Sequence, residues 1–417
     1  MNSMTRVVAL ASAILTLAPI ATLQNASAQD GLILQREEPH DWTLRTTVAV
    51  RVHAEIDRKT KMPKPSEFDF QTAAVVFPLI RDSAGHFMAK PATGTLKLDD
   101  KKADEQYQTL TDYASGTELG KWTLQDWKGG EVELEVTIPV TSFNTKFDEA
   151  AALKLGWPKD AWPPVPASTF KPQLFIDVGT QGSADMAPVQ ELLKKWMGGK
   201  DPKGFPPVTV AKVLAGEVIR HVQTSGNGLR YARTGEVEGL SLQGAWETAK
   251  RGRGTEWDMV CLLTAIYRQA GLPARTVIGY DVGDRKAGDK FLGRNSSGTL
   301  RAWVEFALFD PAGTSQPIIW VPVDVVRMRK SSTRPPPLDK PWAFFGTHDE
   351  LSGVIPFAFQ FHPPTDVVAH GSAAFWGWMV TPKPPEKAVQ AIRFNAISTP
   401  KRAEDMQKEQ ERRKRGR

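Results

Sequence analysis

The chain has 417 residues, a formal net charge of +6 and a single cysteine, Cys261. One cysteine excludes an internal disulfide, so stability must come from packed cores, and the length is sufficient for two or three domains. The last seventeen residues carry eight basic and four acidic side chains, so the rest of the chain is nearly neutral. A nearly neutral body argues against a protein that binds nucleic acid.

The first 28 residues have the three parts of a secretory signal. Arg6 precedes an apolar stretch that ends near Leu23, and Ala26-Ser27-Ala28 forms a small-residue cleavage site. We expect cleavage after Ala28 and a periplasmic or secreted protein, with an uncleaved anchor as the alternative. No later segment has the roughly 20 apolar residues that a membrane span needs, so we expect no transmembrane segment.

Residues 29–205 are predicted to form an antiparallel β-sandwich followed by a linker. Apolar and polar side chains alternate from Trp42 to Ile56, which is typical of a strand with one buried face. A second alternating run spans residues 132–140, and the WTLQDW segment and glycine turn before it predict a hairpin. Further strand-like runs lie at 72–80 and 94–98. We assign structural roles to the histidines scattered through this region: His40, His53 and His86.

Residues 206–330 show a mixed pattern that begins with helices. Val210, Leu214 and Val218 fall on one face of a predicted helix. Helices followed by a run of strands predict an α+β domain. In chain order, the expected elements are helices within 188–197, 209–223, 241–254 and 255–270, and then strands at 275–280, 300–309 and 318–324.

The segment GTEWDMVCLLTAIYRQAGLPAR, at 254–275, predicts a helix with a defined start and end. Thr255 and Asp258 fit a capping box, which places Glu256 at the first helical position, and Gly271 begins the stop signal. Cys261 falls in the second turn, with no basic neighbour or helix N-terminus to stabilise a thiolate. We therefore expect Cys261 to be a buried structural residue.

Four segments in this order resemble the transglutaminase-like superfamily: GTEW at 254–257, GLPAR at 271–275, RAWVE at 301–305 and WVPVD at 320–324. Members typically show Gly-x-Cys opening a helix, Gly-Ile-Pro-Ala-Arg closing it, His-Ala-Trp-Val-Glu on a strand and Trp-Val-Pro-Val-Asp on the next. The resemblance covers about residues 210–325. The whole sequence thus predicts an α+β protein, with an N-terminal antiparallel β-sandwich followed by a transglutaminase-like (papain-like) α+β core.

Carried over by position, the resemblance places the cysteine of the family's triad at Glu256, its histidine at Arg301 and its aspartate at Asp324. Only the aspartate is retained. A carboxylate nucleophile would form a high-energy mixed anhydride, and arginine does not release its proton at neutral pH, so neither half of the reaction survives. The charges of a thiolate beside an imidazolium do survive. We therefore expect Glu256, Arg301 and Asp324 to form a buried or half-buried ion-pair network.

These substitutions favour a catalytically degenerate protein that uses the former cleft for binding or scaffolding in the cell envelope. The expected ligand is a peptide, a protein or a glycan. Residues beside the motif positions are the candidate ligand contacts, namely Trp257, Trp303 and Glu305.

Two enzymatic alternatives remain open. The first is a periplasmic cysteine peptidase or transglutaminase, in which Cys261 would work with a distant base chosen from His348, His362 and His370. The second is amide or glycoside hydrolysis by Glu256 and Asp324. An arginine between two carboxylates would keep both ionised, which suits a general acid badly.

Two further segments follow the core. Residues 331–383 are rich in aromatic side chains and are predicted to be an extension packed on the second domain. Residues 384–417 are predicted to be a charged basic tail, disordered or a frayed helix, which could touch anionic surfaces of the envelope weakly. No cluster of histidine, cysteine and carboxylate side chains has metal-ligand spacing, so we expect no metal and no other cofactor.

Overall fold

The structure is a computed structural model that describes most of residues 33–398. Outside the description are residues 1–32, 53–55, 63–66, 104–105, 112, 180–184, 227, 233–234, 284–289, 292–298, 314–316, 362–373, 382–387 and 399–417. The predicted signal segment therefore lies outside the described residues, as do His53, His362 and His370. Among the residues that are described, no helix is long and apolar enough to cross a membrane.

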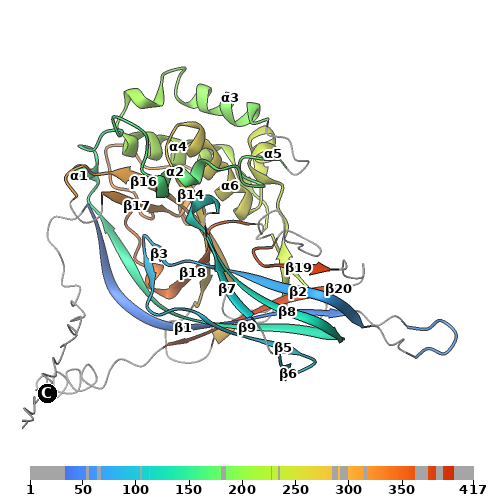
Figure 1. Cartoon of the computed structure of the whole chain (residues 1–417). Coiled ribbons are helices and arrows are strands. Elements are labelled where there is room, and N and C mark those ends of the chain that lie inside the picture. The colour runs from blue at the N-terminus through green and yellow to red at the C-terminus, as the bar shows by residue number, and fades with distance from the viewer. Residues whose placement is uncertain are drawn as a thin grey trace, which may run out of the picture.

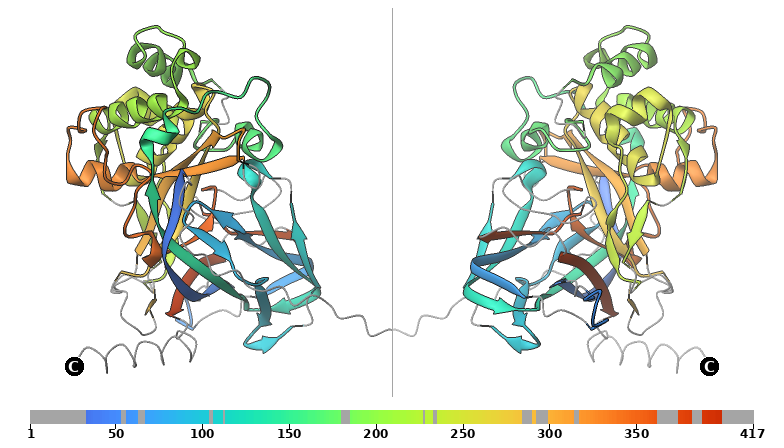
Figure 2. Two further views of the ribbon diagram at one scale, coloured as in Figure 1. Left: turned by 90° about the vertical axis from the view of Figure 1, so that its left-hand side faces the viewer. Right: turned by 90° about the vertical axis from the view of Figure 1, so that its right-hand side faces the viewer.

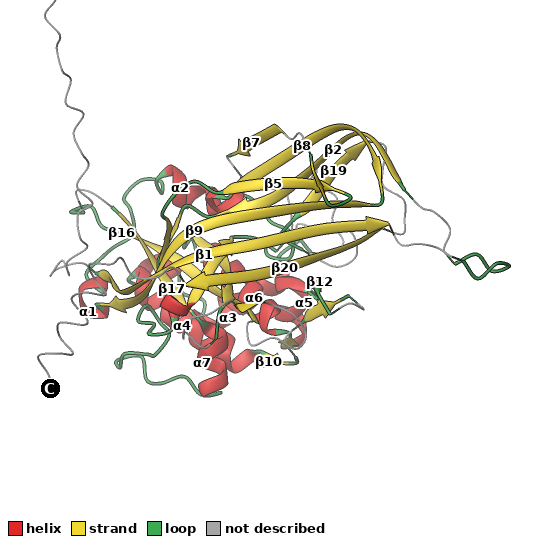
Figure 3. Cartoon of the chain, turned by 90° about the horizontal axis from the view of Figure 1, so that it is seen from below, coloured by secondary structure: helices red, strands yellow, loops and turns green. Residues whose placement is uncertain are grey.

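Long antiparallel strands form the larger of two facing sheets (Figure 1). At its centre, β1 (Leu34–Val52) pairs with β9 (Glu131–Phe147) on one side and β20 (Ala388–Ser398) on the other, and Figure 3 shows the three side by side. The strand order is β11-β12-β20-β1-β9-β4-β3, with β5, β6 and β15 attached beside this path. The remaining bounds are β3 (Asp82–Ser83), β4 (His86–Met88), β5 (Thr93–Leu98), β6 (Lys101–Lys102), β11 (Leu229–Tyr231), β12 (Val237–Leu240) and β15 (Lys290–Phe291).

A four-stranded antiparallel sheet covers the inner face of the larger one. Its order is β19-β2-β8-β7, with β19 (Gly377–Thr381), β2 (Phe68–Leu79), β8 (Glu118–Gly129) and β7 (Gln106–Leu110). Trp122 on β8 reaches across the interface to Gly94 on β5, where a Cβ atom would lie only 2.4 Å from the indole ring. Gly94 is therefore required by inter-sheet packing, because a larger residue would displace the tryptophan.

The predicted hairpin at residues 122–140 is wrong. The strands β8 and β9 follow one another at Gly130, but β8 pairs with β2 and β7, whereas β9 pairs with β1, β4 and β5. The chain turns from one sheet into the other at the glycine pair. Alternation shows that a strand buries one face, but it does not show which strand lies beside it.

The predicted tail and aromatic extension also need correction. Residues 388–398, which we assigned to a disordered or frayed tail, form β20 and pair with β1 along eleven positions. The extension contributes β19 to the smaller sheet and β18 (Val354–Ala358) to the sheet of the second domain. The β-sandwich therefore contains C-terminal strands and is not confined to residues 29–205.

The α+β part lies at one end of the sandwich, as the two side views show (Figure 2). Its antiparallel sheet has the order β17-β16-β14-β18, with β17 (Ile318–Val323), β16 (Thr299–Phe309) and β14 (Ala274–Asp281). The central helix α6 (Glu256–Gln269) packs on β14 and β16. Around it lie α3 (Ala187–Trp196), α4 (Pro207–His221), α5 (Gly244–Arg251) and α7 (Val325–Ser331). The predicted α+β class is confirmed, as are the predicted helices α3, α4, α5 and α6 and the predicted strands β14, β16 and β17, whereas α7 and β18 were not predicted.

Short elements connect these layers. The helix α1 (Glu149–Ala152) directly follows β9, and α2 (Pro164–Ala167) lies in the segment that leads to the second domain. The strand β10 (Gln223–Thr224) pairs in parallel with β13 (Arg253–Gly254) just before α6.

Candidate functional site

The start of α6 places Glu256 at the edge of the core. Thr255 is the N-cap and forms the predicted capping box, in which its side chain accepts a hydrogen bond from the backbone N–H of Asp258. Asp258 in turn accepts bonds from the backbone N–H groups of Gln243, at 2.8 Å, and Gly244, at 2.9 Å. The first turn of α6 is thus held to the start of α5. Glu256, the next residue after the cap, remains 28% exposed.

Asp324 lies between β17 and α7. Its Oδ1 accepts the backbone N–H of Arg327 at 2.8 Å and so caps α7. Its Oδ2 accepts the Nε of Arg301 at 2.8 Å and lies 2.6 Å from Nη2 of the same guanidinium. The Asp324 side chain is fully buried. Burial alone would raise the pKa of this carboxyl, but Arg301 and the hydrogen bonds outweigh it and hold the pKa well below its usual range.

Arg301 on β16 is the centre of a buried cluster of charges. Besides Asp324, its guanidinium contacts Asp281 at 3.4 Å and Glu350 at 3.2 Å, both through Nη1. Burial favours the neutral form, but the three carboxylates prevail and raise the pKa of Arg301 above its ordinary value. Arg301 therefore stays charged and has no role open to it as a proton carrier.

His348 completes this cluster from a distant part of the chain. Its backbone exchanges two hydrogen bonds with Thr145, at 2.8 and 3.0 Å, which fixes it to the end of β9. Its Nε2 lies 2.8 Å from Arg301 Nη2 and 3.4 Å from Asp324 Oδ2. Guanidinium can only donate, so the shorter contact uses Nε2 as an acceptor, and the backbone N–H of Glu350 donates to Nδ1 at 3.2 Å, so both ring nitrogens face donors. Burial, with Arg301 beside it, lowers the pKa of His348 despite its bond to Asp324.

Of the predicted network of Glu256, Arg301 and Asp324, only the pair of Arg301 with Asp324 is present. Arg301 and Asp324 form the expected pair with charge-assisted geometry. Glu256 instead pairs with Lys330 of α7 at 2.7 Å, and no ion pair joins it to Arg301. The reason is that Asp324, Asp281, Glu350 and His348 surround the guanidinium, so Glu256 finds its cation on the neighbouring helix.

A groove runs between the start of α6 and the helix α7. One pocket of about 220 Å³ is lined by Glu256, Trp257, Asp281, Thr299, Leu300, Arg301, Ala302, Val326, Arg327 and Lys330. A second, of about 240 Å³, shares Asp281, Thr299, Arg301 and Arg327 with it and adds Gly283, Glu350 and Gly353. The groove thus carries three acidic and three basic side chains. Glu256, Arg301 and Trp257 all contribute to it, whereas Asp324 lies behind Arg301.

The other two candidate ligand contacts are buried. Trp303 is fully enclosed, and Glu305 forms a pair with Arg275, at 2.8 Å, and accepts the backbone N–H of Ala84 at 3.0 Å. The Arg275 guanidinium is stacked between the rings of Trp320 and Phe359, each 3.9 Å away. These contacts join the core sheet to the sandwich, and neither Trp303 nor Glu305 lines the groove.

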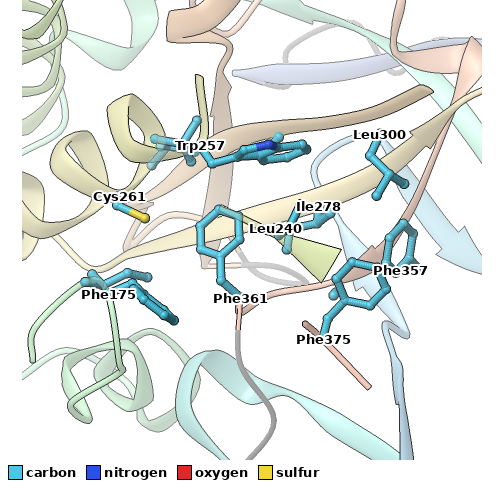
Figure 4. Packing of buried hydrophobic residues seen from close by; sticks show 14 of the residues in the cluster. Phe175, Leu240, Trp257, Cys261, Ile278, Leu300, Phe357, Phe361 and Phe375 are labelled. Carbon is cyan, nitrogen blue, oxygen red and sulfur yellow. The ribbon is translucent and has the colours of Figure 1, made fainter. Parts of the chain in front are cut away.

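Cys261 is buried, as predicted. It lies in the apolar cluster beneath the groove, near Phe175, Leu240 and Phe361 (Figure 4). Burial, reinforced by the negative charge of Asp258, raises the pKa of the thiol. Its chemistry is that of a packing residue.

This burial predicts an unreactive thiol. We expect a thiol alkylator such as iodoacetamide to leave the native protein unmodified over an hour at pH 8, and to label one cysteine per chain after unfolding in guanidinium. Mass spectrometry of the intact protein measures both. Rapid labelling of the native chain would contradict the packing role and would reopen the cysteine route.

Two histidines of the sandwich, His40 and His86, are packed within the fold, in line with the structural roles expected for them. The ring of His40 stacks on Trp42, with centroids 4.1 Å apart, and lies 3.0 Å from Ser398 on β20. His86 is fully buried on β4. Within the described ranges, no group of three or more histidine, cysteine, aspartate or glutamate residues is arranged to hold a metal ion.

Comparisons with known proteins found a matching family profile and similar solved structures. The profile of the transglutaminase-like superfamily matches residues 211–325. A solved structure from Cytophaga hutchinsonii, provisionally described as a cysteine protease, is similar over 87% of this chain and 99% of its own, at 12% identity and a TM-score of 0.45. A protein from Parabacteroides distasonis, provisionally described as a protease, is similar over 66% of this chain and 50% of its own, at 10% identity and a TM-score of 0.22. No curated protein sequence matches the chain.

Proposed function

Because residues 211–325 form a transglutaminase-like core, we propose that this protein is a catalytically degenerate form of that fold, whose groove binds a peptide or protein segment. The observation that carries the proposal is the environment of Arg301. Every nitrogen of its guanidinium faces Asp324, Asp281, Glu350 or His348. The position from which a general base would act is occupied by a permanent cation that is already fully engaged.

The other residues needed for acyl transfer support the same proposal. Glu256, at the position of the nucleophile, is a carboxylate paired with Lys330. The chain has no thiol besides Cys261, which is buried. Hydrolysis by Glu256 and Asp324 is also disfavoured, because Arg301 keeps Asp324 ionised and a general acid must carry a proton.

The charges of the groove indicate what it would bind. Arg301 is fully engaged, but Arg327 and Lys330 are partly exposed on one face of α7 and can accept a carboxylate. Glu256 and Glu350, their present partners, can accept an ammonium group. A segment with side chains of both signs can replace these internal pairs without leaving a charge unpaired.

Absence of catalysis is the first test. We expect no incorporation of a fluorescent primary amine into casein and no release of labelled peptides from it, because neither a thiolate nor a base is available. The same assays on Glu256→Gln and Arg301→Leu provide the controls. Activity in the unaltered protein that either substitution abolishes would refute the proposed degeneracy.

Binding is the second test. We expect a fluorescent acetyl-Lys-Glu-Lys-Glu amide peptide to bind more tightly than acetyl-Ser-Gln-Ser-Gln amide. The double substitution Arg327→Gln, Lys330→Gln should weaken binding about tenfold, since two exposed pairs worth roughly 0.7 kcal/mol each add up to about 1.4 kcal/mol. Arg251→Gln removes an arginine that is 54% exposed and does not line the groove, and it should change nothing. Equal affinity for both peptides would count against a charge-selective groove.

We also propose that the protein works outside the cytoplasm, in the cell envelope. The support is the sequence of residues 1–28, with its basic start, apolar stretch and Ala-Ser-Ala site. N-terminal sequencing of the protein from the periplasmic or culture fraction should begin at Gln29. Recovery of the intact N-terminus in the cytoplasmic fraction would contradict export.

A further inference from the structure

The connection between β1 and β2 ends in an ordered turn, residues 56–62, which we call the tip. The Asp57 carboxylate accepts the backbone N–H groups of Lys59, at 2.7 Å, and Thr60, at 3.1 Å. The Asp57 N–H donates to the carbonyl of Met62 at 2.9 Å, and the Lys61 N–H donates to the carbonyl of Asp57 at 2.8 Å. These bonds close the turn and occupy the acidic side chain with internal donors.

The tip exposes an unusual combination of side chains. Ile56 is 66% exposed and Met62 is 65% exposed, more than any other large apolar side chain in the described part of the chain. Arg58, Lys59 and Lys61 lie between them and are exposed as well. A soluble surface gains nothing from two exposed apolar side chains around three cations, but an interface with apolar and anionic layers accommodates both.

The position of the tip fits such an interface. Figure 1 shows it beyond the ends of β1 and β2, at the side of the sandwich away from the helices. Figure 3 shows the same projection from below, clear of the other described elements. A flat surface can therefore meet the tip first, and the groove between α6 and α7 stays open while it does so.

We propose that the tip docks on an anionic lipid bilayer. Ile56 and Met62 enter the boundary between headgroups and acyl chains, while Arg58, Lys59 and Lys61 face the lipid phosphates. The Asp57 carboxylate offsets one of the three positive charges, which leaves the tip with a net charge of +2 to attract the lipid phosphates. The proposal concerns a surface distant from the groove and does not depend on the proposed peptide binding.

A label on the tip tests insertion directly. The native cysteine is buried, so a cysteine introduced by Thr60→Cys in the full chain can be labelled selectively with an environment-sensitive NBD dye. With vesicles of phosphatidylglycerol and phosphatidylcholine, we expect a blue shift and increased intensity. Phosphatidylcholine vesicles alone should give none. The matched control is Lys159→Cys, an exposed site on the linker, whose dye should not shift.

Substitutions separate the tip from the basic C-terminus. In the labelled protein, Ile56→Ser with Met62→Ser should abolish the blue shift. Replacing Arg58, Lys59 and Lys61 with glutamine should lower vesicle affinity about a hundredfold, since each basic residue near an anionic surface contributes about fivefold. Replacing the C-terminal Arg412 and Arg413 with glutamine should lower affinity but leave the shift at saturating vesicles.

Three results would overturn the proposal. One is absence of binding to the anionic vesicles. Another is a dye signal that survives loss of Ile56 and Met62. The third is binding that depends on the C-terminal arginines alone, or that soluble heparin reproduces with the same blue shift.

Discussion

Replacing Arg301 with leucine is expected to lower the free energy of unfolding by about 3–5 kcal/mol, because it removes one partner of a buried ion pair. Asp324 would remain fully buried with its Oδ2 facing a leucine, and His348 would lose the donor to its Nε2. The measurement is urea unfolding at pH 7.5, followed by tryptophan fluorescence and extrapolated to water.

Two controls make this result specific. Arg327→Leu removes an arginine that is 39% exposed and paired with Glu350, so its effect should stay within about 1 kcal/mol. The double substitution Arg301→Leu, Asp324→Leu should recover part of the lost stability, because no uncompensated charge is left in the core. If Arg301→Leu costs no more than Arg327→Leu, the buried cluster does not stabilise the fold.

Acid is expected to destabilise the protein through a second site, His86. Burial, together with the nearby positive charges of Arg36 and Arg275, lowers the pKa of His86 to about 3. The folded state therefore excludes a proton that the unfolded chain binds below about pH 6.5. The free energy of unfolding is therefore unaffected by His86 above pH 6.5, and it decreases as the pH falls from 6.5 towards 3, because only the unfolded chain gains this proton. At pH 4 the expected loss is about 3 kcal/mol relative to pH 7.5.

The comparison that isolates this effect is His86→Phe, which replaces the imidazole with an apolar ring of similar size. Urea unfolding of both proteins at pH 7.5, 6, 5 and 4 gives two curves of stability against pH. Protonation of other carboxylates and histidines, His348 included, acts on both curves and cancels in their difference. We expect the curves to separate below pH 6.5, with the variant falling less. Parallel curves would show that His86 is not excluded from protonation in the folded state.

The parts of the site that lie within short sequence motifs could be predicted. The pairing of Arg301 with Asp324 was expected from the family resemblance of two motifs, and these motifs lie on adjacent strands, with Val304 opposite Val323. The capping box at Thr255 could be predicted as well, because it depends only on residues close together in the sequence. The partners that come from distant parts of the chain could not be predicted. The helix α7 brings Lys330 to Glu256, and β9 holds His348 against Arg301. His348 lies in a loop-like THDE segment that carries no signal for this contact.

Sheet membership was the least predictable part of the fold. Alternation in 131–140 indicates a half-buried strand, but the choice between β8 and β1 as its neighbour depends on packing that is distant in sequence. For β20 a signal existed. Ile392, Phe394 and Ala396 are buried in alternation with Arg393 and Asn395, a period of two that the charge of the following tail obscured.

The pairing of β20 with β1 has a consequence for how the chain can be made and handled. The central strand of the larger sheet, which begins at Leu34, lacks one of its two neighbours until residues 388–398 have been synthesised. Because this pairing closes a loop of more than 300 residues, it is a non-local step of folding. A chain that lacks these residues cannot complete the larger sheet. For the same reason, shortened expression products that stop before β20 are expected to expose an unpaired strand edge and to aggregate.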